Sequence, residues 1–342
     1  IKTVELYASV KNIGKNAFYG CTSLETFNLR PNSSLETIED GAFAGCTKLT
    51  GFSLPSSLKT IGSQAFYNCS SAAIDFSEAT SLQFIGDYAF AFCGTNAAQT
   101  TTVSLPQNLT EIGYGAFYGC LNLNAFDIAA ENPSFSSQDG ILYNKDGSVL
   151  VLYPPARSGS SFTVPSSVKS IAGGAFAGSP LEQIIIPKGV VEIGGSAFYG
   201  SSKLKTVSLP DTLTTIGSYA FLDCKSLETI SIPQNTKNIG TFLFRGCLKL
   251  TSVQLPSSMT SIPDGLFDSC TSLETITLPS GITEIGQFAF NYCTSLKSID
   301  LPDSVKTIKS YAFRNCSSLD KIDASKVSSI GAFAFQACSK LT

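Results

Sequence analysis

The chain has 342 residues, of which 43% are apolar, and its 23 basic residues nearly balance its 26 acidic ones. It has no run of eighteen apolar residues and no long block of one charge, so we expect no membrane insertion within this chain and no nucleic-acid partner. It also has no histidine, which removes Ser-His-Asp and Cys-His catalysis and the commonest neutral metal ligand. We therefore expect no enzyme activity, no catalytic residue, no metal and no cofactor.

One motif recurs along the whole chain, an Ile followed five residues later by a Phe, thirteen times in all. From Phe198 to Phe313 the step is 23 residues each time. A fixed period of this size predicts stacked coils around one continuous core, because no single repeat can bury its own ring. The Phe positions are Phe18, Phe43, Phe66, Phe90, Phe117, Phe176, Phe198, Phe221, Phe244, Phe267, Phe290, Phe313 and Phe335.

The chain opens and closes inside a repeat. Its first residues, 1–6, match 204–209, and 341–342 match the start of the same segment. Repeat stacks need covered ends, and no capping repeat is visible. We therefore expect an excised segment of a longer protein, with any signal and anchor outside it.

A single repeat can be followed from 204 to 226. Residues 204–209 alternate apolar and polar side chains, which predicts a strand with one buried face, and Pro210 ends that strand. Ile216 then turns inward on the return side. We expect Gly217 to provide a positive φ or a close backbone approach at a corner. The Ala-Phe pair at 220–221 is expected in a short turn or a single helical turn.

The regular step is interrupted once, by a gap of 59 residues between the fifth and sixth repeat Phe. Two β-prone runs, 141–143 and 149–153, flank the dipeptide Asp146-Gly147 there. This arrangement predicts a β-hairpin. Smaller insertions at expected loop positions lie near 30–34, 77–81 and 94–101.

The cysteines follow the repeat. Each of the eleven lies three residues after a repeat Phe, and Ser179 and Ser201 stand at that register in two other repeats. A position that exchanges Cys with Ser indicates a small buried ladder site. A disulfide framework would need pairs at unlike positions, although a bond between neighbouring coils is not sterically excluded.

The pattern Leu-x-x-Ile-x-Leu-Pro, followed by Ile-Gly-x-x-Ala-Phe-x-x-Cys at a 23-residue step, resembles the BspA-like leucine-rich repeat family. The inserted residues 139–147 also resemble a hairpin that interrupts repeats in that family. The departures are Ser179 and Ser201 in place of Cys, Leu243 and Leu266 in place of Ala, and Pro263 in place of Gly. We expect these to be local packing changes.

The resemblance implies a right-handed solenoid with short strands on one face. We expect an α/β repeat solenoid, mostly β, of about 13–14 coils of ~23 residues with one β-hairpin insertion. We expect residues 1–342 to form one domain, with N-terminal coils in 1–129, the hairpin insertion in 130–167 and C-terminal coils in 168–342.

The resemblance also implies a surface or secreted protein of a host-associated bacterium that adheres to host matrix proteins, without catalytic residues to carry over. We expect a monomeric extracellular or cell-surface module that binds a protein or a glycan. The alternatives are a structural spacer and an accessory domain that presents another module outside this segment.

Exposed positions between the inward residues of each strand form the first candidate site. They can bind a ligand, as repeat proteins commonly do on such faces, or they can be a merely solvated sheet face. The candidates are Asp127, Ser208, Ser231, Gln254, Thr277 and Asp300.

Aromatic residues suggest two further surfaces. Tyr143 and Tyr153 of the hairpin are candidates for a recognition knob, or else cover an irregular coil. A stripe just before the repeat Ala can be an exposed ledge, but we favour rings that stack between coils. Gly265 interrupts this stripe, whose members are Tyr219, Phe242, Phe288, Tyr311 and Phe333.

Overall fold

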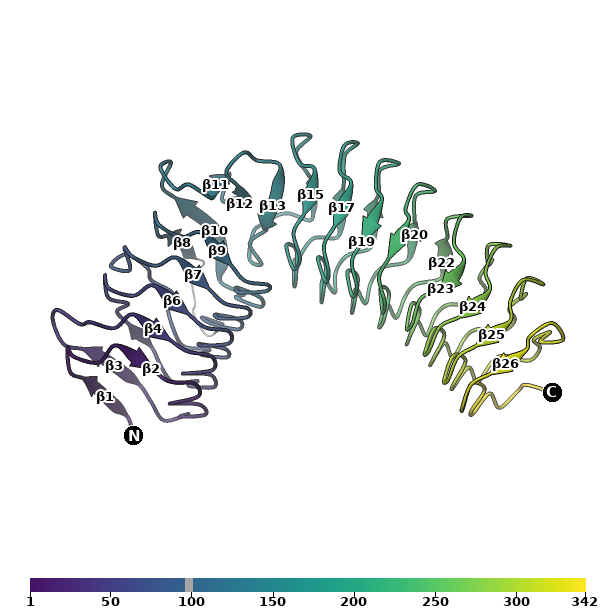
Figure 1. Cartoon of the computed structure of the whole chain (residues 1–342), viewed down its shortest axis with the longest axis horizontal. Helices are drawn as coiled ribbons and strands as arrows, with labels where there is room; N and C mark the ends of the chain where they lie inside the picture. Colours follow the sequence, from purple (N-terminus) through teal and green to yellow (C-terminus); the bar gives the residue numbers. More distant parts are fainter. Residues whose placement is uncertain (96–100) are drawn as a thin grey trace. The chain divides into compact units, whose positions relative to one another are not determined.

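The computed structural model describes residues 1–95 and 101–342, so the predicted insertion near 94–101 lies partly outside the described residues. The chain packs as two compact units, residues 1–158 and 159–342. Each unit is a stack of coils whose strands are nearly all parallel (Figure 1). Equivalent residues of neighbouring coils are 23 apart in most of the stack, which confirms the predicted repeat. The division into one domain with three parts stays a prediction.

The first unit has a strand side and a return side. On the strand side β1, β3 and β5 pair in parallel, and β10 pairs with β8. On the return side five dipeptide strands pair in sequence order. The strand-side elements are β1 (Thr3–Leu6), β3 (Thr26–Leu29), β5 (Gly51–Phe52), β8 (Thr101–Leu105) and β10 (Leu123–Ile128). The return-side elements are β2 (Asn12–Ile13), β4 (Thr37–Ile38), β6 (Thr60–Ile61), β7 (Phe84–Ile85) and β9 (Glu111–Ile112).

The predicted hairpin is confirmed, and it has one strand more than expected. β12 (Ile141–Asn144) pairs antiparallel with β13 (Val149–Leu152), and also with β11 (Phe135–Gln138), which the sequence reasoning missed. Asp139 and Gly140 join β11 to β12 with φ of 51° and 76°. Two successive positive φ values are those of a type I′ hairpin turn, for which Asp-Gly is a preferred pair.

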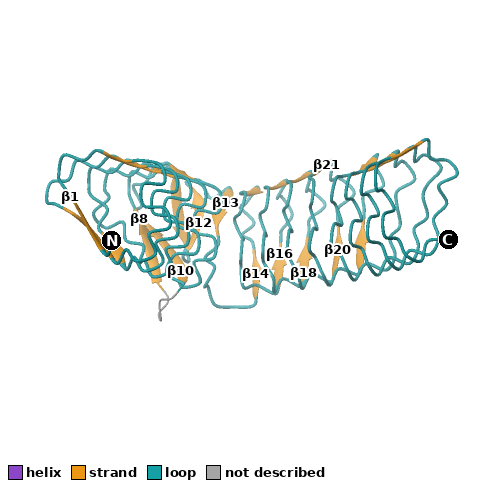
Figure 2. Ribbon diagram, turned by 90° about the horizontal axis from the view of Figure 1, so that it is seen from below, coloured by secondary structure: helices purple, strands orange, loops and turns teal. Residues whose placement is uncertain are grey.

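The second unit repeats the same arrangement. On the strand side β14, β16 and β18 form one parallel sheet and β20 and β22 another, while 275–278 form no strand. Figure 2 shows β14, β16 and β18 side by side, with β21 at the opposite edge of the coils. The strand-side elements are β14 (Ser161–Thr163), β16 (Gln183–Ile185), β18 (Thr206–Ser208), β20 (Thr229–Ser231) and β22 (Ser252–Gln254). The return-side elements are β15 (Ser170–Ile171), β17 (Glu192–Ile193), β19 (Thr215–Ile216), β21 (Asn238–Ile239), β23 (Ser261–Ile262), β24 (Glu284–Ile285), β25 (Thr307–Ile308) and β26 (Ser329–Ile330).

The repeat Phe residues form a column of stacked rings inside each unit. Phe221 is fully buried and stacks on Phe198 and Phe244, with ring centroids 4.9 and 5.8 Å apart. Ile216 of the same coil is also buried, as predicted, and so is Leu213. Offset stacking adds to the free energy gained by removing each ring from water.

The α/β label is wrong, because the described residues contain no helix. In each coil the repeat Phe instead lies within a run of consecutive tight turns. We call this part of the coil the turn side. In all thirteen repeats the residues two before and two after the Phe have positive φ, for example Tyr219 at 60° and Asp223 at 56°. A right-handed helix requires negative φ throughout, so this backbone cannot form even one helical turn.

The recurring Gly is explained by close approach and not by its φ. Gly217 does not have a positive φ. A Cβ added to it would lie 2.4 Å from the backbone nitrogen of Gly195 in the preceding coil. Gly62, Gly86 and Gly113 meet the preceding coil in the same way. The absent side chain therefore lets the coils pack at their hydrogen-bonding distance.

The cysteines form the predicted ladder. All eleven lie in the described ranges and are free thiols. The thiol of Cys247 donates to the carbonyl oxygen of Phe221 in the preceding coil, with Sγ and O 3.2 Å apart. The hydroxyl of Ser201 donates to the carbonyl of Phe176 in the same manner, at 2.7 Å. Both side chains are small donors, which explains why Ser replaces Cys at this register.

Thiol reactivity provides a first prediction. Burial raises the pKa of the Cys120 thiol to about 12, so almost none of it is thiolate at neutral pH. A hydrogen bond from Cys316 lowers the pKa of Cys338, which is partly exposed, as is Cys21. We expect iodoacetamide to alkylate Cys21 and Cys338 in the folded chain and the other nine only after unfolding, as counted by mass spectrometry. Rapid native labelling of Cys120 would contradict the buried ladder.

Candidate functional site

The structure places all six strand-face candidates at exposed positions. Asp127 lies on β10 in the first unit, and the other five lie in the second unit. Thr277 and Asp300 are on the strand side of their coils but outside any strand. Exposure makes these residues accessible to a partner, and it does not by itself distinguish a binding face from a solvated one.

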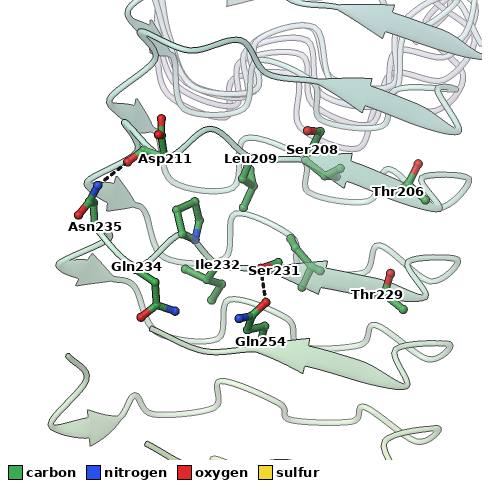
Figure 3. A pocket seen from close by; sticks show the side chains of 13 residues that line it. Thr206, Ser208, Leu209, Asp211, Thr229, Ser231, Ile232, Gln234, Asn235 and Gln254 are labelled. Atoms are coloured by element: carbon green, nitrogen blue, oxygen red, sulfur yellow. Dashed lines mark hydrogen bonds between the residues drawn. The ribbon is translucent and has the colours of Figure 1, made fainter. Parts of the chain in front are cut away.

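Three of the candidates meet in one groove. Ser208, Ser231 and Gln254 extend from β18, β20 and β22 in successive coils and line an open groove of about 600 Å3 (Figure 3). The groove also takes in the segments that follow these strands, including Asp211 and Asn235. The predicted face is therefore concave at these three residues.

Hydrogen bonds fix the polar side chains around the groove. The Ser231 hydroxyl donates to Oε1 of Gln254 at 2.9 Å, and Nδ2 of Asn235 donates to the main-chain carbonyl of Asp211 at 2.9 Å. In the next turn Gln234 accepts from the backbone nitrogen and the hydroxyl of Ser257, at 2.8 and 2.9 Å. Oriented side chains lose less conformational entropy when a ligand binds them.

The groove lies at a break in the strand-side ladder. The backbone nitrogen of Ile186 donates to the Ser208 carbonyl at 3.0 Å, and that of Ile232 donates to the Gln254 carbonyl at 2.9 Å. Within the described residues, the backbone nitrogen of Leu209 makes no equivalent hydrogen bond to the Ser231 carbonyl, and β18 and β20 belong to different sheets. Main-chain edges therefore line the groove together with the side chains.

Sequence reasoning missed several groove residues. Thr206 and Thr229 open strands, and Asp211, Gln234 and Asn235 follow the Pro that closes them. All are polar residues at repeat positions that recur in every coil, so nothing in the local pattern singles out these copies. The departure of Leu243 from the repeat Ala was visible in the same coil.

The hairpin tyrosines do not form a recognition knob. Tyr143 and Tyr153 are each only 3% exposed, so the structure corrects their place as surface candidates. Burial raises the pKa of the Tyr143 hydroxyl to about 12 and also raises that of Tyr153. Both rings lie in the core because β11 to β13 cover the end of an irregular coil, where Leu142 and Leu150 are buried beside them.

The aromatic stripe is a stack of rings, as we favoured. Phe288 stacks on Tyr311 at 4.9 Å and Tyr311 on Phe333 at 5.3 Å between ring centroids, and Tyr219 stacks on Phe242 at 5.5 Å. Gly265 interrupts the stripe because the Phe242 ring occupies its space, with a ring carbon 2.1 Å from where a Cβ would be. These rings therefore serve packing between coils.

Two classes of site are not found in the described part of the chain. Residues 1–95 and 101–342 contain no group of three His, Cys, Asp or Glu side chains arranged to hold a metal ion. The same residues contain no helix with the length and hydropathy needed to cross a membrane.

Comparisons with solved structures support the fold. A leucine-rich repeat protein from Eubacterium ventriosum is 24% identical, with a TM-score of 0.72, over 99% of this chain and 91% of that chain. The pneumococcal vaccine antigen PcpA is 26% identical, with a TM-score of 0.67, over 97% and 78%. A leucine-rich cell surface protein from Faecalibacterium prausnitzii is 24% identical, with a TM-score of 0.52, over 97% and 79%.

No curated protein matches the sequence significantly. The family profile described as the BspA type leucine-rich repeat region matches in six copies, over residues 11–139, 156–274 and 260–342. These ranges contain all thirteen Ile-Phe repeats and all of the cysteines. The chain belongs to the BspA-type leucine-rich repeat family.

Proposed function

We propose that this chain is a non-enzymatic binding module at the cell surface or outside the cell, and that it mediates adhesion. Its partner is an extracellular protein or glycan that binds the strand side of residues 159–342. The observation that carries the proposal is the groove in which Ser208, Ser231 and Gln254 meet. Concave sites with a few oriented polar groups are where ligands bind most often.

The relatives support the same setting. PcpA, which is similar over nearly the whole chain, is described as a pneumococcal vaccine antigen, and that description supports a surface or extracellular setting. The repeat fold itself presents an extended surface and a core filled with Phe rings, which leaves little room for a reaction centre. We propose that the chain acts as a monomer, because each coil stack can present its strand side without a second copy.

Binding to extracellular matrix tests the proposal. We expect the chain to bind immobilised matrix extract saturably, and Ser208→Arg with Gln254→Arg to weaken that binding at least tenfold, because two long cations would fill the groove. The control is Asn238→Arg, which places a single long cation at an exposed position of β21 on the return side. Binding that never saturates would favour a structural spacer, and equal binding by all three proteins would exclude the strand side.

A further inference from the structure

The groove lies where the repeat departs from its own pattern. Leu243 and Leu266 stand at the position of the small Ala, and each is fully buried. Neighbouring coils have Ala220 and Ala289 at this position, also fully buried. Two successive coils therefore carry an isobutyl group where the others carry a methyl group. Added volume in a close-packed core must be accommodated by shifting the neighbours.

The distances between successive Phe rings are larger at these coils. In residues 159–342 the ring centroids are 5.8 Å apart between Phe221 and Phe244, and 5.9 Å apart between Phe244 and Phe267. Every other step of this column lies between 4.9 and 5.3 Å. The two widest steps are therefore the two that involve Phe244, the residue after Leu243. The second of them ends at Phe267, the residue after Leu266. The oversized residues thus coincide with a local widening of the spacing between the Phe rings.

The coil that contains Leu243 also lacks one strand pairing with each neighbouring coil, although turn-side hydrogen bonds such as Phe221 N–H to the Leu243 carbonyl still join the coils. On its strand side β20 does not pair with β18, and on its return side β21 does not pair with β23, within the described residues. Pro263 contributes to the second break, because it stands where Gly240 donates its N–H to the Ile216 carbonyl and a proline has no N–H to donate. A cavity opens at each break, of about 600 Å3 by β18 and about 240 Å3 by Pro263.

The lining of the larger groove indicates the chemistry of its ligand. Among the described lining residues Asp211 is the only ionisable one, and none is aromatic. The remaining polar side chains are hydroxyls and amides, which both donate and accept hydrogen bonds. A groove without cations and with one carboxylate disfavours anionic ligands. It also lacks the Tyr, Trp and Arg anchors that dominate tight protein interfaces.

We propose that Leu243 and Leu266 hold this groove open, and that it binds a neutral oligosaccharide, whose hydroxyls complement the hydroxyl and amide side chains of Ser208, Ser231 and Gln254. The proposal rests on the strand side being the binding side, and it goes further by naming the ligand class and the core residues that shape the site. A sugar hydroxyl can also bond to the main-chain edges that β18 and β20 leave unpaired with one another.

Two sets of immobilised probes test the ligand class with the full chain. One contains short neutral oligosaccharides, and the other contains the same oligosaccharides carrying sulfate or carboxylate groups. We expect saturable binding to neutral probes only, weakened at least tenfold by Gln254→Ala, because that variant loses the amide without adding bulk. Thr277→Ala is the matched control, since Thr277 is exposed on the same side but outside the groove.

The outcomes separate this proposal from the function proposed above. In one outcome Ser208→Arg with Gln254→Arg weakens matrix binding, but the chain does not bind neutral oligosaccharides. That outcome overturns the ligand class and leaves the strand side as the binding side. If Gln254→Ala and Thr277→Ala change the binding of neutral oligosaccharides equally, the groove is not the sugar site.

Hydrogen exchange tests the role of the two leucines without any ligand. In the double variant Leu243→Ala/Leu266→Ala we expect the coils to close and the Leu209 amide to pair with the Ser231 carbonyl. Its exchange should slow at least tenfold, with loss of neutral oligosaccharide binding. Unchanged exchange of this amide in a folded double variant would overturn the role of the leucines. If the double variant does not fold, Leu243→Val, which removes less volume, gives the same readout.

Discussion

Replacing Phe221 with Ala is expected to lower the free energy of unfolding by about 3–5 kcal/mol. The ring is fully buried and stacks on both neighbours, at 4.9 Å from Phe198 and 5.8 Å from Phe244. The loss combines the free energy of transferring the ring from water with the cost of the cavity left behind, because the backbone ladder of the turn side prevents the coils from collapsing into it. Urea unfolding followed by circular dichroism measures the change.

The control for this variant lies at the end of the same column. Phe335 is partly exposed and stacks on one ring, Phe313, at 5.3 Å. Phe335→Ala should therefore cost less than half as much as Phe221→Ala, because it removes one ring contact and leaves no closed cavity. Equal losses from the two variants would show that the Phe column is not the source of the stability of the stack.

The core and the spacing of the coils could be predicted from the sequence, because both follow from invariant residues at a fixed step. Ile216 and Phe221 are buried as expected, and the Cys-to-Ser exchange at Ser201 correctly indicated a small side chain at a buried register. The Asp-Gly turn at 146–147 correctly indicated a hairpin. In each case one local chemical property had a single structural consequence.

The errors arose where tertiary context decides between local options. Ala-Phe segments have reasonable helix propensity, but hydrogen bonds to the next coil, such as Phe221 N–H to the Leu243 carbonyl at 3.0 Å, hold this segment in turns with positive φ. The sequence left Tyr143 and Tyr153 open between a recognition knob and a cover over an irregular coil, and their burial favours the cover. The groove depends on an unformed strand pair, which no residue type encodes alone.

The candidate site was predictable only in part. The alternation of the strand placed Ser208, Ser231 and Gln254 on the exposed face, as the structure also does. Their meeting in a groove depends on the spacing between coils, which is set by buried residues distant in sequence. Leu243 was recognised as a departure from the repeat, but its consequence appears only once the Phe steps on either side of it are compared.

Spacing between coils can be tested directly at the recurring Gly. A Cβ added to Gly240 would lie 2.2 Å from the backbone nitrogen of Ser218 and 2.5 Å from its Cα. Both contacts are with backbone, which cannot rotate away, so the two coils must separate and lose the hydrogen bond from Gly240 N–H to the Ile216 carbonyl at 2.9 Å. We expect Gly240→Ala to lower the free energy of unfolding by about 3 kcal/mol.

Gly14 provides a matched control, because it occupies the same repeat position in the first coil and has nothing within 4 Å of an added Cβ. Neither glycine has a positive φ, so backbone strain is the same in both substitutions and only the steric contact differs. Gly14→Ala should leave the unfolding midpoint in urea unchanged or raise it slightly, since Ala reduces the conformational entropy of the unfolded chain. Equal destabilisation by both variants would mean that the glycine acts through its own backbone flexibility, and the contact between coils would then not determine their spacing.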